Sequence, residues 1–165
     1  MAPRPPADAV VALRSLPRRY RGLFAGLGDD ESPDDLAHRV GAGGRSAFDH
    51  VAAASRSLTT QDRALEQVLV EDSPTLDPAS QDTHEREAEQ QPGGSVDERL
   101  SELDIDATRL ADRAEHLGAS DWARSGRRDD GSEVSAADIV WFAVDDALTH
   151  LGAAEKVLAE VRAQR

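Results

Sequence analysis

A chain of 165 residues with no cysteine and a net charge of −13 is the size of one ordinary domain and can bury a core without disulfides. The missing cysteine excludes a disulfide framework, a cysteine metal site and a protein thiol nucleophile. The negative charge disfavours nucleic-acid backbones and anionic lipid surfaces, and no stretch approaches the length of a signal-peptide core or a bilayer span. We therefore expect one cytoplasmic domain over residues 1–165, with neither a nucleic-acid nor a membrane partner.

Helical periodicity dominates the chain. Apolar residues recur at helical spacing in four long segments, and no segment alternates with a period of two, which predicts an all-α fold. The first segment covers residues 10–27, where Pro17 is expected to bend or divide the helix. A short extra helix follows in "SPDDLAHRVG", with Ser32 as its cap, Pro33 in its first turn and Gly41 as its stop.

The three later segments begin at recognisable capping sequences. Ser46, Ser95 and Ser135 each stand three residues before an acid, which is the capping-box arrangement. The second helix is predicted over residues 47–69, and the fourth over residues 135–161. The third helix has its apolar residues at alternating steps of four and three, as in bundle packing, and Gly118 is expected to end it. These residues are Val96, Leu100, Leu103, Ala107, Leu110, Ala114 and Leu117.

Residues 71–94 separate the second and third helices. The segment is acidic and nearly devoid of large apolar side chains, so we expect a long and partly mobile crossover loop. Four helices with one long connection after the second predict a four-helix bundle. The order in which the helices neighbour one another is left open.

The fourth helix carries two polar residues on its predicted apolar stripe. Asp146 and His150 lie one turn apart there, so both are expected to point inward. Residues four apart on a helix are close enough for both side chains to reach one metal ion. His50, on the stripe of the second helix, is the candidate third ligand. The rest of the stripe is Ile139, Phe142, Ala143, Ala153 and Val157.

Two histidines and a carboxylate are the ligands of catalytic zinc sites, which keep one position open for water or substrate. The same ligands hold nickel, iron or manganese. The alternative is a metal-free core in which the Asp146 carboxylate bonds to His150 or His50. Asp145, next to Asp146, is expected to face solvent.

Several sequence stretches around these residues resemble the DinB-like four-helix bundles. They are "SAFDHVAAASRSL", "SDWARSG" and "DDALTHLGAAEKVL", in this order along the chain. That superfamily includes metal-dependent thiol transferases and the N-terminal domain of mycothiol-dependent maleylpyruvate isomerase. The resemblance implies one divalent metal at His50, Asp146 and His150, zinc in preference to nickel. The sequence departs from the family pattern at Asp146, where relatives carry histidine or glutamate, and at Arg45, where many carry tryptophan.

The resemblance further implies a metal-dependent and thiol-cofactor-dependent transferase or isomerase of the mycothiol type, with an unknown small-molecule substrate. Because the chain has no cysteine, the thiol would come from a small cofactor, and the metal would lower its pKa. The open metal position could instead activate water, which predicts a metal-dependent hydrolase. A third reading is a non-catalytic binding or homodimerisation bundle with a degenerate metal site.

Three arginines precede the fourth helix. Arg124, Arg127 and Arg128 are candidates for holding an anionic substrate or the thiol cofactor at the mouth of the site. The alternative is a solvated loop whose positive charge is offset by Asp129 and Asp130.

Overall fold

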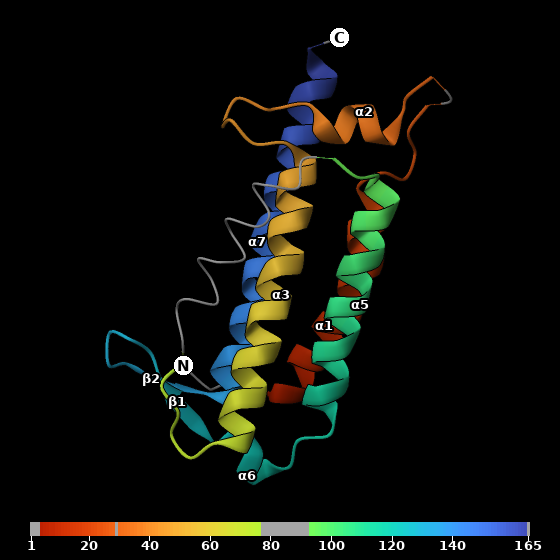
Figure 1. Ribbon diagram of the computed structural model, residues 1–165. Coiled ribbons are helices and arrows are strands. Elements are labelled where there is room, and N and C mark those ends of the chain that lie inside the picture. The colour runs from red at the N-terminus through yellow and green to blue at the C-terminus, as the bar shows by residue number, and fades with distance from the viewer. Residues whose placement is uncertain (1–3, 29, 77–92, 165) are drawn as a thin grey trace.

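Four long helices form the body of the protein. The computed structural model describes residues 4–28, 30–76 and 93–164, and within them the all-α prediction is confirmed (Figure 1). The predicted short helix is present as α2, and a second short helix, α6, was not predicted. The second, third and fourth predicted long helices are present close to their expected bounds, whereas the first begins and ends earlier than residues 10–27. The helices are α1 (Pro6–Gly22), α2 (Pro33–His38), α3 (Ala47–Val70), α5 (Val96–Glu115), α6 (Ala119–Trp122) and α7 (Ala136–Ala163).

The long helices pack so that each has two neighbours. Helix α3 lies between α7 and α5, and α1 packs against α5 and α7 on the other side. Helices α3 and α5 run in the same direction, opposite to α1 and α7, so that α2 lies at one end of the bundle and α6 at the other (Figure 1). The predicted crossover between α3 and α5 falls largely on residues 77–92, which lie outside the described residues.

The apolar stripe predicted for the third helix forms one side of the core. Its members from Val96 to Ala114 are buried, and Leu117 is partly buried against the same cluster. This stripe packs antiparallel against α1 and parallel against α3 (Figure 1). None of the described helices is both long enough and apolar enough to cross a membrane.

All three predicted capping boxes are present. At α3 the hydroxyl of Ser46 accepts a hydrogen bond from the Asp49 amide at 3.1 Å, and the Asp49 carboxylate accepts from the Ser46 amide at 2.8 Å. Ser95 and Ser135 begin α5 and α7 in the same way. These reciprocal bonds satisfy helix amides that have no partner within the helix, and so fix where each helix begins.

Three sequence expectations about helix ends need correction. Helix α1 continues through Pro17 without division. Helix α2 ends at His38, before Gly41. Gly41 instead lies against α7, where an added Cβ would come within 2.9 Å of the Glu160 carboxylate. Gly118 does not end α5, which stops at Glu115, but caps the start of α6.

The predicted loop before α7 contains a small hairpin. Strands β1 (Ser125–Arg127) and β2 (Glu133–Ser135) pair antiparallel, with Gly126 opposite Val134. The backbone of Arg127 also exchanges hydrogen bonds with the segment after α3, donating to Pro74 at 2.8 Å and accepting from Leu76 at 2.7 Å. The hairpin therefore joins the end of α3 to the start of α7.

The core face of α7 is rotated from the predicted stripe. Phe142, predicted to be buried, is 48% exposed, whereas Val144, Ala147 and Leu151 are buried. Because α7 packs against both α3 and α1, its buried face is broad and is centred beside the predicted one. Asp146 consequently lies at the edge of the core, half-buried.

Candidate functional site

Two histidines from separate helices meet at the interface of α3 and α7. The Nδ1 atoms of His50 and His150 are 3.2 Å apart, although the residues are 100 positions apart in the chain. Their rings are tilted by 42° with centroids 5.5 Å apart. His50 belongs to the first turn of α3, where its amide donates to the carbonyl of the Ser46 cap. The capping box thus fixes the backbone that presents one half of the pair.

Asp146 approaches the other ring nitrogen of His150. Its Oδ2 lies 3.7 Å from Nε2 of His150, one turn along α7. This separation is an ion-pair distance and is longer than a hydrogen bond. His150 therefore presents one nitrogen to His50 and the other to Asp146. Both side chains of this α7 pair are partly buried, with 19% of the His150 side chain and 29% of the Asp146 side chain exposed.

Both imidazoles have a pKa below the ordinary histidine value. Burial is the main cause for His50, and the neighbouring His150 and the positive charge of Arg45 lower its pKa further. Burial also lowers the pKa of His150, with added effects of Arg45 and Arg56, while the Asp146 carboxylate opposes the shift. At neutral pH both rings are therefore neutral, which is the form that binds a metal ion.

Tyr20 of α1 connects a third helix, α1, to the α7 side of the site. Its buried hydroxyl donates to the carbonyl of Ala147 at 2.5 Å. Burial raises the pKa of this phenol, and the charge of Asp146 adds to the shift, so the hydroxyl remains a donor. The bond fixes the α7 backbone directly after Asp146. Tyr20 lies in the first predicted helical segment, residues 10–27, and a buried tyrosine hydroxyl needs a hydrogen-bond partner. Which group would be that partner could not be predicted from the sequence.

The histidine pair fits two positions around a divalent ion. Two nitrogens bound to tetrahedral zinc at about 2.0–2.1 Å are separated by about 3.3 Å, and the two Nδ1 atoms are 3.2 Å apart. The predicted carboxylate ligand, Asp146, lies 3.7 Å from Nε2 of His150 and not at the two Nδ1 atoms. Across residues 4–28, 30–76 and 93–164, no three histidine, aspartate or glutamate side chains are grouped so that they could hold one ion. The structure thus brings His50 and His150 together, with Asp146 next to Nε2 of His150.

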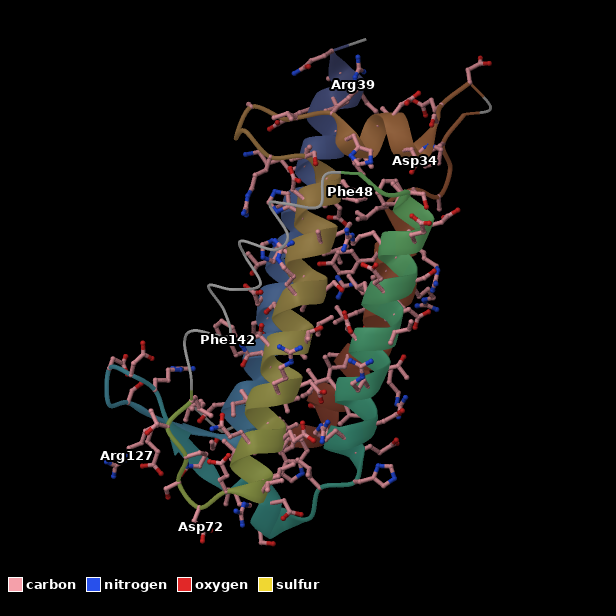
Figure 2. The ribbon with its side chains drawn as sticks, viewed as in Figure 1. Asp34, Arg39, Phe48, Asp72, Arg127 and Phe142 are labelled. Atoms are coloured by element: carbon pink, nitrogen blue, oxygen red, sulfur yellow. The ribbon has the colours of Figure 1, made fainter. Side chains whose placement is uncertain are left out.

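The predicted arginines lie at the other end of α3. The Arg124 guanidinium donates to the carbonyls of Val68 at 2.9 Å and Glu71 at 3.0 Å, in the last turn of the helix and just after it. His50 is 18 residues before Val68, about 27 Å along the helix. In Figure 2, Phe48 lies at one end of α3 and Arg127 at the other. Arg128 is exposed on the same hairpin, so the structure does not bring the three arginines to the histidines.

A groove of 440 Å³ lies elsewhere, between α1 and α5. Its arginines are largely matched by acids: Arg14 pairs with Asp112 and Glu115, and Arg21 pairs with Asp104. We place no site there, because the charges of Arg14 and Arg21 are compensated by these acids. It is lined by Arg14, Pro17, Arg18, Arg21, Asp104 and Thr108.

Solved structures of similar shape support the bundle assignment. YfiT from Bacillus subtilis, described as a probable metal-dependent hydrolase with an unusual four-helix bundle topology, superposes with a TM-score of 0.74 over 95% of this chain and 91% of its own, at 13% identity. This protein has the YfiT fold. The expected likeness to DinB-like four-helix bundles is thereby confirmed at the level of the fold. No family model matches the sequence, and no curated protein matches it.

The mycothiol-dependent maleylpyruvate isomerase has a similar structure. It superposes with a TM-score of 0.68 at 11% identity, covering 90% of this chain but 60% of the isomerase. A mutant of that isomerase gives a TM-score of 0.66 at 12% identity, with the same coverage. This chain therefore corresponds in fold to a little over half of the isomerase.

Proposed function

We propose that this protein is a divalent-metal-dependent enzyme whose metal centre is built on His50 and His150, with the Asp146 carboxylate next to His150. It would use a small thiol cofactor of the mycothiol type as a transferase or isomerase. One observation carries the proposal: two neutral imidazole nitrogens from different helices face each other at 3.2 Å. Zinc is the expected ion and nickel the second, because both bind imidazole well.

The chain's own groups divide the work at such a centre. A bound divalent ion would lower the pKa of a thiol or a water molecule. His50 and His150 would hold the ion, and Tyr20 holds the α7 backbone in place through Ala147. Arg45 places positive charge near both imidazoles, locally opposing the overall charge of −13 and favouring an anionic reactant.

The two similar structures support two reactions. The isomerase is mycothiol-dependent and YfiT is described as a probable hydrolase, so a metal-dependent hydrolase is the second candidate. YfiT matches over nearly its whole length, which favours that alternative. For either reaction we expect a small-molecule substrate, and a thiol of the mycothiol type would place the enzyme in the cytoplasm. Self-association into a homodimer stays a prediction.

Metal content tests the proposal. Protein purified without an affinity tag or chelator should contain close to one divalent ion per chain by elemental mass spectrometry. His50→Ala and His150→Ala should each lose it, because one imidazole alone binds weakly. His116→Ala is the matched control, since His116 is exposed and bonds the Asp112 carbonyl of its own helix. A metal-free wild type that takes up neither zinc nor nickel would leave the non-catalytic bundle as the better reading.

Cobalt-loaded wild type then separates the two reactions. A low-molecular-weight thiol that binds the ion should add an intense sulfur-to-metal charge-transfer band in the near ultraviolet. The absence of this band at saturating thiol would favour the hydrolase.

A further inference from the structure

We infer that Asp146 is a positioning residue: it fixes the tautomer of His150, with the proton on Nε2 and the Nδ1 lone pair directed toward His50, and it is not itself a metal ligand. The tautomer of the metal-free protein does not depend on the proposed function. The role of Asp146 toward a bound ion rests on the proposed function.

The contact between the two rings limits where the protons are. A neutral imidazole has one N–H donor and one lone pair. Two Nδ1 atoms 3.2 Å apart form a hydrogen bond only if one of them carries a proton and the other does not. Either His50 or His150 is therefore the donor.

Asp146 decides between the two arrangements. An ionised carboxylate only accepts hydrogen bonds, and its Oδ2 lies 3.7 Å from Nε2 of His150. This charge favours a proton on Nε2 over a lone pair there. The single proton of neutral His150 is then on Nε2, which leaves its Nδ1 as the acceptor. His50 is consequently the donor, through its own Nδ1.

The same geometry separates the carboxylate from the predicted ion. An ion held by both Nδ1 atoms would lie between α3 and α7, on the edge of the His150 ring that faces His50. Asp146 lies next to the other ring nitrogen, Nε2. In metal sites a ligating histidine commonly donates its second N–H to a carboxylate, which orients the ring and makes it a stronger ligand. A glutamate, one methylene longer, would extend further past the ring; aspartate stays beside it.

Nitrogen NMR of the metal-free protein tests the tautomer. The protein has five histidines, and spectra of His50→Ala and His150→Ala assign the two of interest. Wild type should show His150 protonated at Nε2 and His50 at Nδ1. Asp146→Ala should lower the share of the Nε2–H form of His150, and Asp146→Asn, whose carbonyl still accepts, should restore it. A wild-type His150 protonated at Nδ1, or no change in Asp146→Ala, would overturn the inference.

Cobalt binding tests whether Asp146 is a ligand. Asp146→Asn should keep the band positions and intensities of cobalt-loaded wild type, because the ligands are unchanged. Asp146→Ala should bind about 10–100-fold more weakly, the usual effect of losing an orienting partner. Asp145→Asn is the matched control. It also removes one carboxylate charge, one residue from Asp146, but the Asp145 carboxylate pairs with Arg4 and not with a histidine.

The outcomes separate the two proposals. Altered cobalt bands in Asp146→Asn would make Asp146 a ligand, which contradicts the inference and keeps the metal centre. A wild type that binds no cobalt would defeat the proposed function and the statement about ligation together. The NMR measurement would still decide the tautomer.

Discussion

Arg124, a candidate for binding an anionic ligand, binds backbone carbonyls instead. Its guanidinium presents several N–H donors in a fixed fork, which suits a carboxylate or phosphate. Here the donors meet Val68 and Glu71 carbonyls, which have no partner inside α3 because the helix ends. The side chain therefore holds the strand-bearing loop against the end of α3.

Arg124→Ala is expected to lower the free energy of unfolding by about 1–3 kcal/mol, because it removes charge-assisted bonds to carbonyls at the helix end. Arg127→Ala, at an exposed position of the same hairpin, should cost less than about 0.5 kcal/mol. Urea unfolding of both variants measures the difference. Metal content should be unchanged in both. Equal costs would mean that the Arg124 contacts contribute little.

At the scale of an element, the start of α3 serves both folding and the site. Ser46 and Asp49 satisfy each other's amides, and this first turn carries His50. The start of α5 has the same capping box at Ser95 and Glu98 but carries no residue of the histidine pair. The two helix starts thus form a natural comparison.

Ser46→Ala and Ser95→Ala should each lower the free energy of unfolding by about 1 kcal/mol, the usual cost of removing a cap. Only Ser46→Ala should also weaken cobalt binding, because fraying of the first turn of α3 moves His50. Thermal or urea unfolding, together with a cobalt titration, checks both effects. Equal cobalt affinities in the two variants would show that the cap does not position His50.

At the scale of the whole molecule, polar contacts join the parallel helices α3 and α5. The Ser55 hydroxyl donates to Asp106 at 2.6 Å. Two turns further on, Arg113 donates to Asp62 at 2.7 and 3.3 Å. Asp62 is only 6% exposed, so its carboxylate would be costly to bury without this partner. Such directional pairs fix the axial position of one helix relative to the other, which apolar stripes alone define less strictly.

Arg113→Leu should destabilise the fold by about 2–4 kcal/mol, because it leaves the buried Asp62 carboxylate unpaired. The estimate is toward the low end, since Arg113 is 29% exposed and water reaches part of the pair. Asp62→Leu combined with Arg113→Leu should recover most of the loss. Urea unfolding of the single and double variants distinguishes this from a simple loss of packing, in which the double variant would be no more stable.

Features encoded within one turn of helix were predictable from the sequence, and features that depend on packing between helices were not. The capping boxes at Ser46, Ser95 and Ser135 marked three helix starts because the bonding groups lie three residues apart. Strands β1 and β2 are too short to show alternation. Helix α7 is so rich in apolar residues that its buried face could not be placed to within one position, which is why Phe142 was predicted to be buried.

The candidate site divides in the same way. Periodicity drew attention to His50, Asp146 and His150, and the structure places two of them in contact. Which ring nitrogen faces which neighbour depends on the rotation of α3 relative to α7. Residue spacing in the sequence does not determine that rotation. The distance from Arg124 to the histidines depends likewise on which end of α3 the hairpin meets.

The 100 positions between the two histidines couple any bound ion to folding. An unfolded chain holds these imidazoles far apart, so an ion that needs both would bind the native state almost exclusively. By mass action, free ion at 100 times its dissociation constant would add about 2.7 kcal/mol to native stability. The histidine pair would then act as a reversible crosslink between α3 and α7, a role that disulfides cannot fill in a chain without cysteine.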